Sequence, residues 1–320
     1  MINITGDELI QQAGQVTRSE YEELLTEFFA AIPYQNDLPE IDPSVEEEIA
    51  RHCLNTELTE KRAKACSNVG AGAAEWFYPT HKRETRVAIG IYTALCVAVD
   101  DFCGEHLQEV QNFRLNMVAR KPQVKFLEAL SRLLSSLDEH YEPFCSDKII
   151  TTSINYMGAC VLEHHTTGKF EALKTASMFP HYLRLMTGIP EAYVFFILHK
   201  HIYNLDSLTP FIQALPDLVE FTNGINDLLS FYKESIVGVE RNNYVYLQAM
   251  AQQDTALSVL HKIAGDVQDY IRKVKSTLEA NGDLLEVVDA YIKGNIVFHI
   301  RLARYRLSEL SIPSLAMPIN

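Results

Sequence analysis

The sequence predicts an all-α protein, a helical bundle around a central apolar cavity. Three observations support this. Glycine (14) and proline (12) are sparse, apolar residues recur at three- and four-residue intervals over long stretches, and strand-like alternation is missing. With 320 residues, 47% of them hydrophobic and 15 each of Tyr and Phe, the chain can form a large core and still line a cavity.

The expected helices follow the apolar periodicity, and Pro and Gly mark the breaks between them. They are expected at residues 19–32, 44–55, 57–77, 83–103, 123–138, 142–164, 180–187, 190–202, 208–234, 254–279 and 284–309. The segment 87–99 is apolar on every side, which is typical of a helix buried at the centre of a bundle. Because there is no linker-like stretch or internal repeat, we expect one domain over residues 1–320, with residues 1–18 poorly ordered or loosely packed.

The net charge of −14, from 28 basic and 42 acidic side chains, argues against a nucleic-acid partner because the chain would repel a phosphate backbone. An acidic protein that handles an anionic substrate needs metal cations between the two.

The cysteines indicate a cytoplasmic location. All six are scattered through the first half of the chain without a CxxC pair, as expected for reduced thiols. The first ten residues lack the apolar stretch of a signal peptide, so none is expected. The apolar run Val87–Val99 is shorter than the roughly 20 residues that cross a bilayer, so no membrane span is expected either.

The first candidate site is the acidic group Asp100, Asp101 and Glu105, which follows the apolar segment. Carboxylates in this position either mark where a helix reaches water or form a hard-cation site at the mouth of a cavity, and the residues alone leave both readings open. Successive helical residues point about 100° apart, so the two aspartates cannot face one point. We expect Asp100 to bind metal and Asp101 to pair with a basic side chain.

The second candidate is the segment NDLLSFYKE, in which Asn226, Ser230 and Glu234 recur every four residues and share one helical face. An amide oxygen, a hydroxyl and a carboxylate suit magnesium, and Lys233 adds a positive charge. The alternative is a polar helix face in solvent. The strongly apolar residues between these positions favour a metal site.

Two further features suit an anion. Arg304 and Tyr305 offer a planar fork of donors and a hydroxyl near the end of the expected last helix, although Arg-Tyr is a common pair. In RLMTGIP, Gly188 can end one helix and Pro190 can begin the next. Such a break is either an ordinary kink or a place where free carbonyls face a cavity, with Arg184 one turn earlier to bind an anion.

Together these motifs resemble those of the class I terpene cyclases. Within that group the chain is most similar to the fungal sesquiterpene cyclases of the trichodiene synthase family, through EWFYP, NDLLSFYKE and GNIVFHIRLARY, over about residues 60 to 308. The resemblance implies the single-domain class I terpenoid synthase bundle. It also implies a Mg²⁺-dependent enzyme that ionises an isoprenoid diphosphate, most simply farnesyl diphosphate, and cyclises the carbocation. Family members are often homodimers.

The resemblance further implies roles for individual residues. Asp100 would bind two of three Mg²⁺ ions, and Asn226, Ser230 and Glu234 the third. Asp101 would pair with Arg304 when the site closes. The diphosphate would be held by Arg184, Lys233, Arg304 and Tyr305, while Thr187 and Gly188 would take the linker and effector positions that trigger ionisation.

The chain departs from the family pattern at the third acid of the first motif, because Glu105 stands one position later than in DDxxD. Phe298 stands where tryptophan is frequent, and the loop after Glu234 is short. Phe77, Tyr92 and Phe298 are candidate cavity liners that could stabilise a carbocation, with core packing as the alternative.

Two other functions fit an all-helical chain. A prenyl chain-elongating synthase shares helices, magnesium and diphosphate, but it would carry a second DDxxD motif, and none follows Asp101. A non-catalytic helical scaffold would show no magnesium-dependent stabilisation by pyrophosphate.

Overall fold

The structure, a computed structural model, describes residues 13–32, 38–166, 173–202 and 205–315. Within these ranges the chain is helical, and the only β-type pairing is one isolated bridge between Tyr141 and His199. The all-α prediction is confirmed. The elements lie close to the predicted ranges, as the following bounds show.

The first half contains α2 (Arg18–Ala31), α3 (Pro43–Leu54), α4 (Glu60–Gly72), the π-helical turn η1 (Ala73–Phe77), α5 (Arg83–Phe102), η2 (Cys103–Glu105), α6 (Leu107–Gln111), α7 (Phe113–Val118), α8 (Lys125–Ser135), η3 (Leu137–Glu139) and α9 (Pro143–Thr166). The second half contains η4 (Lys174–Ala176), α10 (Phe179–Thr187), α11 (Pro190–Phe195), α12 (Leu205–Phe231), the π-helical turn η5 (Tyr232–Ile236), α13 (Tyr244–Gln252), α14 (Ala256–Leu278), α15 (Gly282–Arg301), η6 (Ala303–Tyr305), η7 (Leu307–Glu309) and η8 (Pro313–Leu315).

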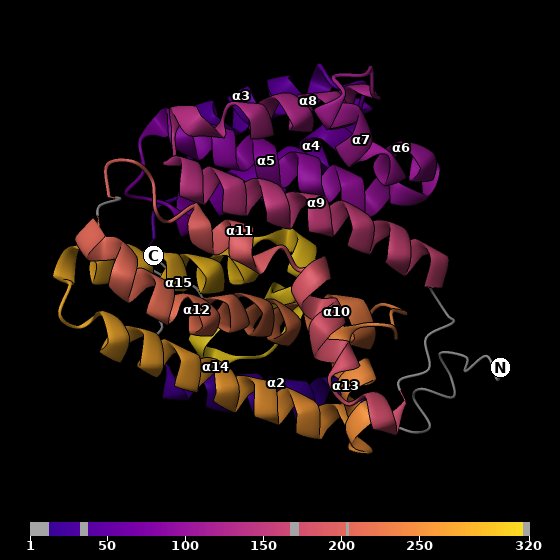
Figure 1. The fold of residues 1–320 in the computed structure, drawn as a ribbon. Coiled ribbons are helices and arrows are strands. Elements are labelled where there is room, and N and C mark those ends of the chain that lie inside the picture. The colour runs from indigo at the N-terminus through magenta and orange to yellow at the C-terminus, as the bar shows by residue number, and fades with distance from the viewer. Residues whose placement is uncertain (1–12, 33–37, 167–172, 203–204, 316–320) are drawn as a thin grey trace.

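The helices form two groups, one above the other in Figure 1. In the upper group α5 packs against α3, α4 and α8, and in the lower group α12 packs against α14 and α15. Helices α10 and α11 connect the groups, since α10 contacts α9 and α13 while α11 contacts α9 and α12. The carboxyl ends of α5 and α12 therefore belong to opposite groups.

Glycines allow the closest helix contacts near the cavity. A Cβ added to Gly70 of α4 would lie 2.3 Å from the carbonyl oxygen of Gly90 in α5. A Cβ on Gly294 of α15 would lie 1.8 Å from the carbonyl oxygen of Trp76 in η1. Only glycine permits these approaches, which bring α4, α5, η1 and α15 together around one space.

Some boundaries differ from the predictions. Helix α15 ends at Arg301, because Leu302 adopts an extended conformation and Arg306 has a φ of 61°, so the helix does not reach residue 309. The expected helix 190–202 already ends at Phe195. Three helices were missed, α6, α7 and α13. They are short segments of 5, 6 and 9 residues, in which periodicity is hard to recognise.

The predicted N-terminal segment lies partly outside the described residues, which begin at 13. The described part is packed, because Ala13 and Val16 are buried in the main core.

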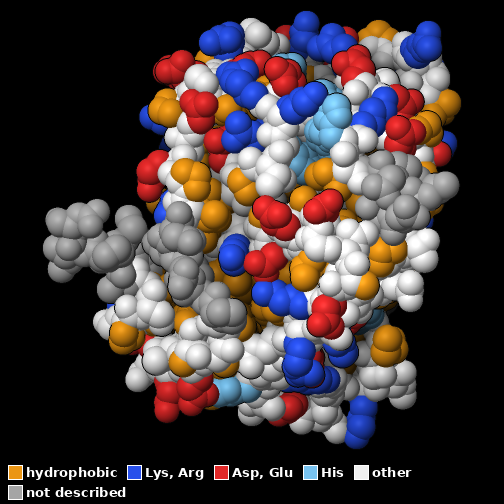
Figure 2. Space-filling view, turned by 90° about the vertical axis from the view of Figure 1, so that its left-hand side faces the viewer, with side chains coloured by type: hydrophobic (Ala, Val, Ile, Leu, Met, Phe, Trp, Pro, Cys, Tyr) orange, Lys and Arg blue, Asp and Glu red, His pale blue; other side chains and the backbone are white. Residues whose placement is uncertain are grey.

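Among the described residues, one helical stretch, Arg83–Glu105, which comprises α5 and η2, is long and apolar enough to cross a membrane, with a mean hydropathy of 1.6. However, 67% of its most apolar window is buried inside the protein, as in a core helix. Figure 2 shows one face of the molecule, on which acidic and basic side chains are interspersed and apolar side chains form small separate patches. Among the described residues of this face, the apolar side chains form no broad surface.

Candidate active site

The central cavity has a volume of about 220 Å³ and lies between the two groups of helices. Its walls come from α4, η1, α5, α9, the α10–α11 break, α12, η5, α15 and η6. A second, more polar compartment of about 180 Å³ shares five of its lining residues: Asp100, Arg184, Thr187, Asn226 and Glu234. The two compartments thus meet where the predicted metal and diphosphate residues gather.

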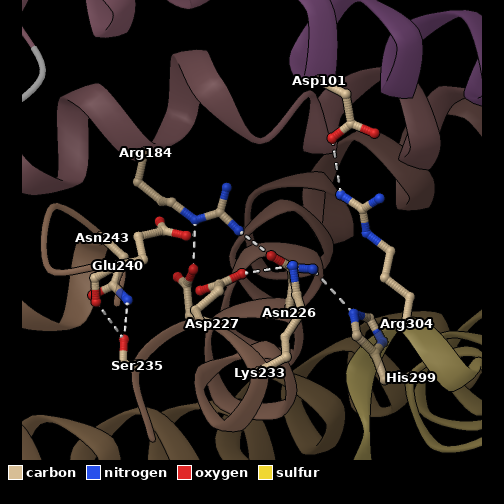
Figure 3. Close-up of polar contacts among 11 residues, drawn as sticks. Asp101, Arg184, Asn226, Asp227, Lys233, Ser235, Glu240, Asn243, His299 and Arg304 are labelled. Carbon is tan, nitrogen blue, oxygen red and sulfur yellow. Dashed lines mark hydrogen bonds and ion pairs between the residues drawn. The ribbon is translucent and has the colours of Figure 1, made fainter. Parts of the chain in front are cut away.

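Of the first acidic motif, only Asp100 lines the cavity. Asp101 does not line the cavity; its Oδ1 lies 3.4 Å from Nη2 of Arg304, the contact drawn in Figure 3. Glu105 faces away and forms two hydrogen bonds with Arg62, so the structure gives it no place beside Asp100. The guanidinium of Arg62 also lies over the ring of Phe102, 3.9 Å from its centroid, which holds Glu105 at the outer surface.

The second motif spans the end of α12 and the turn η5. Asn226 and Glu234 line both compartments. Ser230 lies between them but is only 1% exposed and lines neither, and its Oγ has no hydrogen-bond partner among the described residues. Glu234 belongs to a π-helical turn, a distortion that is frequent at functional sites.

The predicted diphosphate residues all line the central cavity, namely Arg184, Lys233, Arg304 and Tyr305. Arg184 binds two side chains of α12: its Nε lies 2.7 Å from Asp227 and its Nη2 donates to Asn226 at 2.9 Å. The Nζ of Lys233 lies 3.2 Å from Oε1 of Glu234. Burial lowers the pKa of Arg304, but the neighbouring Asp101 outweighs this and raises it overall.

Arg304 and Tyr305 reach the cavity from η6, after α15 has ended, and not from the last long helix as predicted. The extended residue Leu302 turns the chain back toward the cavity. Tyr305 is buried, and its ring lies against that of His299, with 4.4 Å between centroids.

The predicted helix break lies between Thr187 and Pro190. Gly188 has an ordinary φ of −85°, and the positive φ of 50° belongs to Ile189. A β-branched residue in this conformation is unusual and indicates local strain. Gly188 instead leaves room for two side chains, because an added Cβ would lie 2.2 Å from Asn223 Oδ1 and 2.4 Å from Arg184 Nη1.

The structure adds residues that sequence reasoning did not assign. Asp227, the second residue of NDLLSFYKE, binds Arg184, and its Oδ2 has no hydrogen-bond partner among the described residues. His299 contacts Asn226. Glu163 and Glu240 line the polar compartment. Asp227 belongs to the NDLLSFYKE motif, so the sequence alone could have identified it. His299, Glu163 and Glu240 lie outside the motif, and only the fold brings them to the site.

Burial and neighbouring charges change the pKa of the acidic side chains around the site. Burial raises the pKa of Asp227 to about 6, although Arg184 opposes the effect. Burial and then nearby carboxylates raise the pKa of Glu163 and of Glu240 to about 7. The pKa of Asp100 is also raised, first by burial and then by Asp101. Its side chain nevertheless remains accessible from the cavity. Closely spaced carboxylates of this kind favour a bound cation.

The apolar end of the central cavity is lined by Phe77 and Phe298, whose ring centroids are 4.9 Å apart. Tyr92, the third candidate liner, does not line this cavity and follows the alternative of core packing. Tyr92 is fully buried, with its hydroxyl 2.8 Å from Ser153 and its ring packed edge-on to Phe196.

The residues present fit a magnesium site. Asn226, Ser230 and Glu234 offer only oxygen donors, and the partnerless Ser230 Oγ is a buried polar atom that an ion can satisfy. Over the described ranges, no group of three or more His, Cys, Asp or Glu side chains is placed to hold a metal. An amide and a hydroxyl would therefore have to complete the ligand set.

Comparisons with known proteins agree with this arrangement. The family model described as Trichodiene synthase (TRI5) matches residues 44–312. An (E)-beta farnesene synthase of Metarhizium brunneum is 32% identical over 300 residues, covering 92% of this chain and 91% of the relative. The trichodiene synthase of Fusarium sporotrichioides is 21% identical over 255 residues, covering 78% of this chain and 67% of the relative.

The fold is also found among solved structures. The linalool/nerolidol synthase from Streptomyces clavuligerus, solved in complex with 2-fluorogeranyl diphosphate, superposes with a TM-score of 0.62 at 13% identity, covering 81% of this chain and 100% of that one. The described helices therefore form the class I terpene synthase fold. Since the family model spans most of the sequence and a relative above 30% identity covers nearly all of it, the chain belongs to the trichodiene synthase family of terpene synthases.

Proposed function

We propose that this protein is a Mg²⁺-dependent sesquiterpene cyclase that releases diphosphate from farnesyl diphosphate and cyclises the carbocation. One observation carries the proposal. Oxygen donors from the end of α5 and from the α12–η5 junction line the same cavity as a group of basic side chains and an apolar, aromatic-lined end. A cavity with one polar and one apolar end matches a substrate with a charged head and a hydrocarbon tail.

Asp100 would hold magnesium on one side of the cavity, and Asn226, Ser230 and Glu234 on the other. Bound Mg²⁺ would supply positive charge that stabilises the departing diphosphate, so the allylic C–O bond can break without a protein nucleophile. The family resemblance suggests three ions.

The basic side chains would hold the diphosphate. Arg184 now binds Asp227 and Asn226, so it must give up at least one of these contacts to reach an anion. Lys233 and Arg304 are likewise paired with acids, Glu234 and Asp101. Each of these cations is thus held in place before the substrate arrives, which lowers the cost of organising the site.

The apolar end would shape the hydrocarbon chain. Phe77 and Phe298 present aromatic surface there, and each face can contribute about 0.5 to 2 kcal/mol to a nearby cation. Water must be excluded until the carbocation loses its proton, so residues 103–108 and 235–243 would close over the site.

The test is to incubate the purified protein with farnesyl diphosphate and Mg²⁺, without isopentenyl diphosphate, and to analyse the volatile products. We expect a cyclic sesquiterpene and released diphosphate, and neither product with EDTA. Asn226→Ala and Glu234→Ala should abolish turnover and keep the helical circular dichroism spectrum. Glu286→Ala, an exposed carboxylate of α15 that lines neither compartment, is the matched control.

Full activity in the Asn226 and Glu234 variants would refute the proposed roles of these residues. A product formed only when isopentenyl diphosphate is added would instead identify a chain-elongating synthase.

A further inference from the structure

His299 is buried beside the cavity, at 2% exposure, on the face of α15 that meets α12. Its Nδ1 lies 2.7 Å from the carbonyl oxygen of Asn295, one turn earlier on the same helix. Its Nε2 lies 3.1 Å from Nδ2 of Asn226, the contact drawn in Figure 3. The imidazole thus connects the backbone of α15 with the first residue of the NDLLSFYKE motif.

The partners determine where the protons lie. A carbonyl oxygen can only accept, so the hydrogen of the neutral imidazole is on Nδ1 of His299 and Nε2 is an acceptor. On the other side, Arg184 can only donate, so the Asn226 atom facing it must be the carbonyl oxygen. The amide nitrogen of Asn226 therefore faces His299, and every group has a compatible partner.

From this geometry we propose that His299 is a positioning residue that keeps the Asn226 amide turned so that its oxygen faces the cavity. An asparagine amide can flip, and only its oxygen is a ligand for a hard cation such as magnesium. A flipped amide would present its NH₂ group to the cation and its oxygen to the lone pair of His299. The inference rests on the proposed function, because it concerns magnesium at this site.

Arg184 and His299 both fix the orientation of the Asn226 amide in this structure. In the proposed function, Arg184 breaks its contact with Asn226 when it binds the diphosphate. When Arg184 leaves Asn226 for a diphosphate, it no longer selects the orientation of the amide. His299 stays, because it is anchored to the backbone of its own helix and packed against Tyr305 and Phe298. The orientation then depends on the imidazole alone.

The test uses His299→Phe, which keeps an aromatic ring but removes the acceptor, and His299→Gln, whose side-chain oxygen can accept at a similar reach. The readout is binding: the melting temperature in pyrophosphate is followed as MgCl₂ is titrated, which gives a Mg²⁺ midpoint. Loss of a group that orients a metal ligand typically weakens binding by about 10- to 100-fold. We expect a shift of that size for His299→Phe and a much smaller one for His299→Gln.

His81→Phe is the matched control. His81 is also buried, at 4% exposure, and bonds a backbone carbonyl at 2.8 Å, but it lines neither compartment. Its variant should lower the melting temperature without shifting the Mg²⁺ midpoint.

A double-mutant cycle separates positioning from general destabilisation. The carboxylate of Asn226→Asp presents an oxygen in either orientation, so it should improve Mg²⁺ binding when His299 is Phe. With His299 present, Asn226→Asp should improve Mg²⁺ binding several-fold less, because the second oxygen of the new carboxylate faces the lone pair of the imidazole.

The outcomes separate the two proposals. If the wild-type protein shows no stabilisation by Mg²⁺ and pyrophosphate, the proposed function fails. If it does, but His299→Phe keeps the wild-type midpoint or Asn226→Asp has equal effects in both backgrounds, the positioning role of His299 is overturned.

Discussion

Gly188→Ala is a sharp test of the geometry at the α10–α11 break. The added methyl group would lie 2.2 Å from Asn223 Oδ1 and 2.4 Å from Arg184 Nη1, whereas ordinary contacts are 3.4 to 4 Å. Arg184 can move aside, but Asn223 is buried at 4% exposure on α12. Because Gly188 has a negative φ, the backbone conformation suits alanine, and the clash alone determines the effect.

Overpacking of this kind costs about 1 to 3 kcal/mol. At about 2.1 cal/mol/K of unfolding entropy per residue, the 320 residues give about 0.7 kcal/mol/K, so the melting temperature should fall by about 1.5 to 4.5 °C. Displacement of the Arg184 guanidinium should also reduce turnover of farnesyl diphosphate by about tenfold or more, because small misplacements of a binding group slow catalysis strongly.

Differential scanning calorimetry and product quantification would measure the two effects. Gly265→Ala is the matched control: it lies inside α14, and an added Cβ there meets nothing within 4 Å. It should stabilise the protein by about 0.5 to 1 kcal/mol and leave turnover unchanged. If Gly188→Ala keeps both the wild-type melting temperature and wild-type turnover, the close approach described here is incorrect.

Two further predictions concern the polar atoms of the site. Ser230→Ala removes a buried hydroxyl that lacks a partner among the described residues, so without Mg²⁺ the protein should be as stable as the wild type or up to about 1 kcal/mol more stable. Mg²⁺ and pyrophosphate should then stabilise it less, and unchanged stabilisation in a melting experiment would exclude Ser230 as a ligand. The second prediction concerns pH. Since the pKa of Glu163 and of Glu240 rises from 4.5 to about 7 in the folded protein, folding binds protons in this range. Below about pH 6.5 the buried His81, His199 and His299 act in the opposite direction, because burial lowers their pKa from 6.5 to about 4. Stability without metal should therefore decline as pH rises from about 6.5 to 8, while stabilisation by Mg²⁺ grows because metal binding releases protons. A flat or rising stability profile without metal would contradict the described environment of these acids.

Local sequence patterns sufficed for much of the site. Asn226 and Glu234 are eight residues apart, two intervals of four, and both side chains line one cavity although Glu234 belongs to a π-helical turn. The acid that ends an apolar helix, Asp100, reaches the same cavity because α5 is buried along its length. The break before Pro190 was predicted in the correct place, although the residue with a positive φ is Ile189 and Gly188 has an ordinary helical conformation.

Contacts between distant segments could not be predicted in the same way. Nothing near Tyr92 indicates that its hydroxyl binds Ser153 on α9 and so leaves the cavity wall. Likewise, nothing near Glu105 indicates that Arg62 draws it outward. The contact between His299 and Asn226 depends on how α15 crosses α12, a property of packing and not of either segment alone.

The proposed function depends most on oxygen donors from α5, α12 and η5 holding divalent ions in one cavity. A crystal grown with Mn²⁺ and pyrophosphate, measured at a wavelength with anomalous manganese signal, tests this directly. We expect anomalous peaks at coordination distance from Asp100 and from Asn226, Ser230 and Glu234, with Arg184 turned toward the diphosphate. Peaks located elsewhere, or none beside these side chains while pyrophosphate is bound, would contradict it.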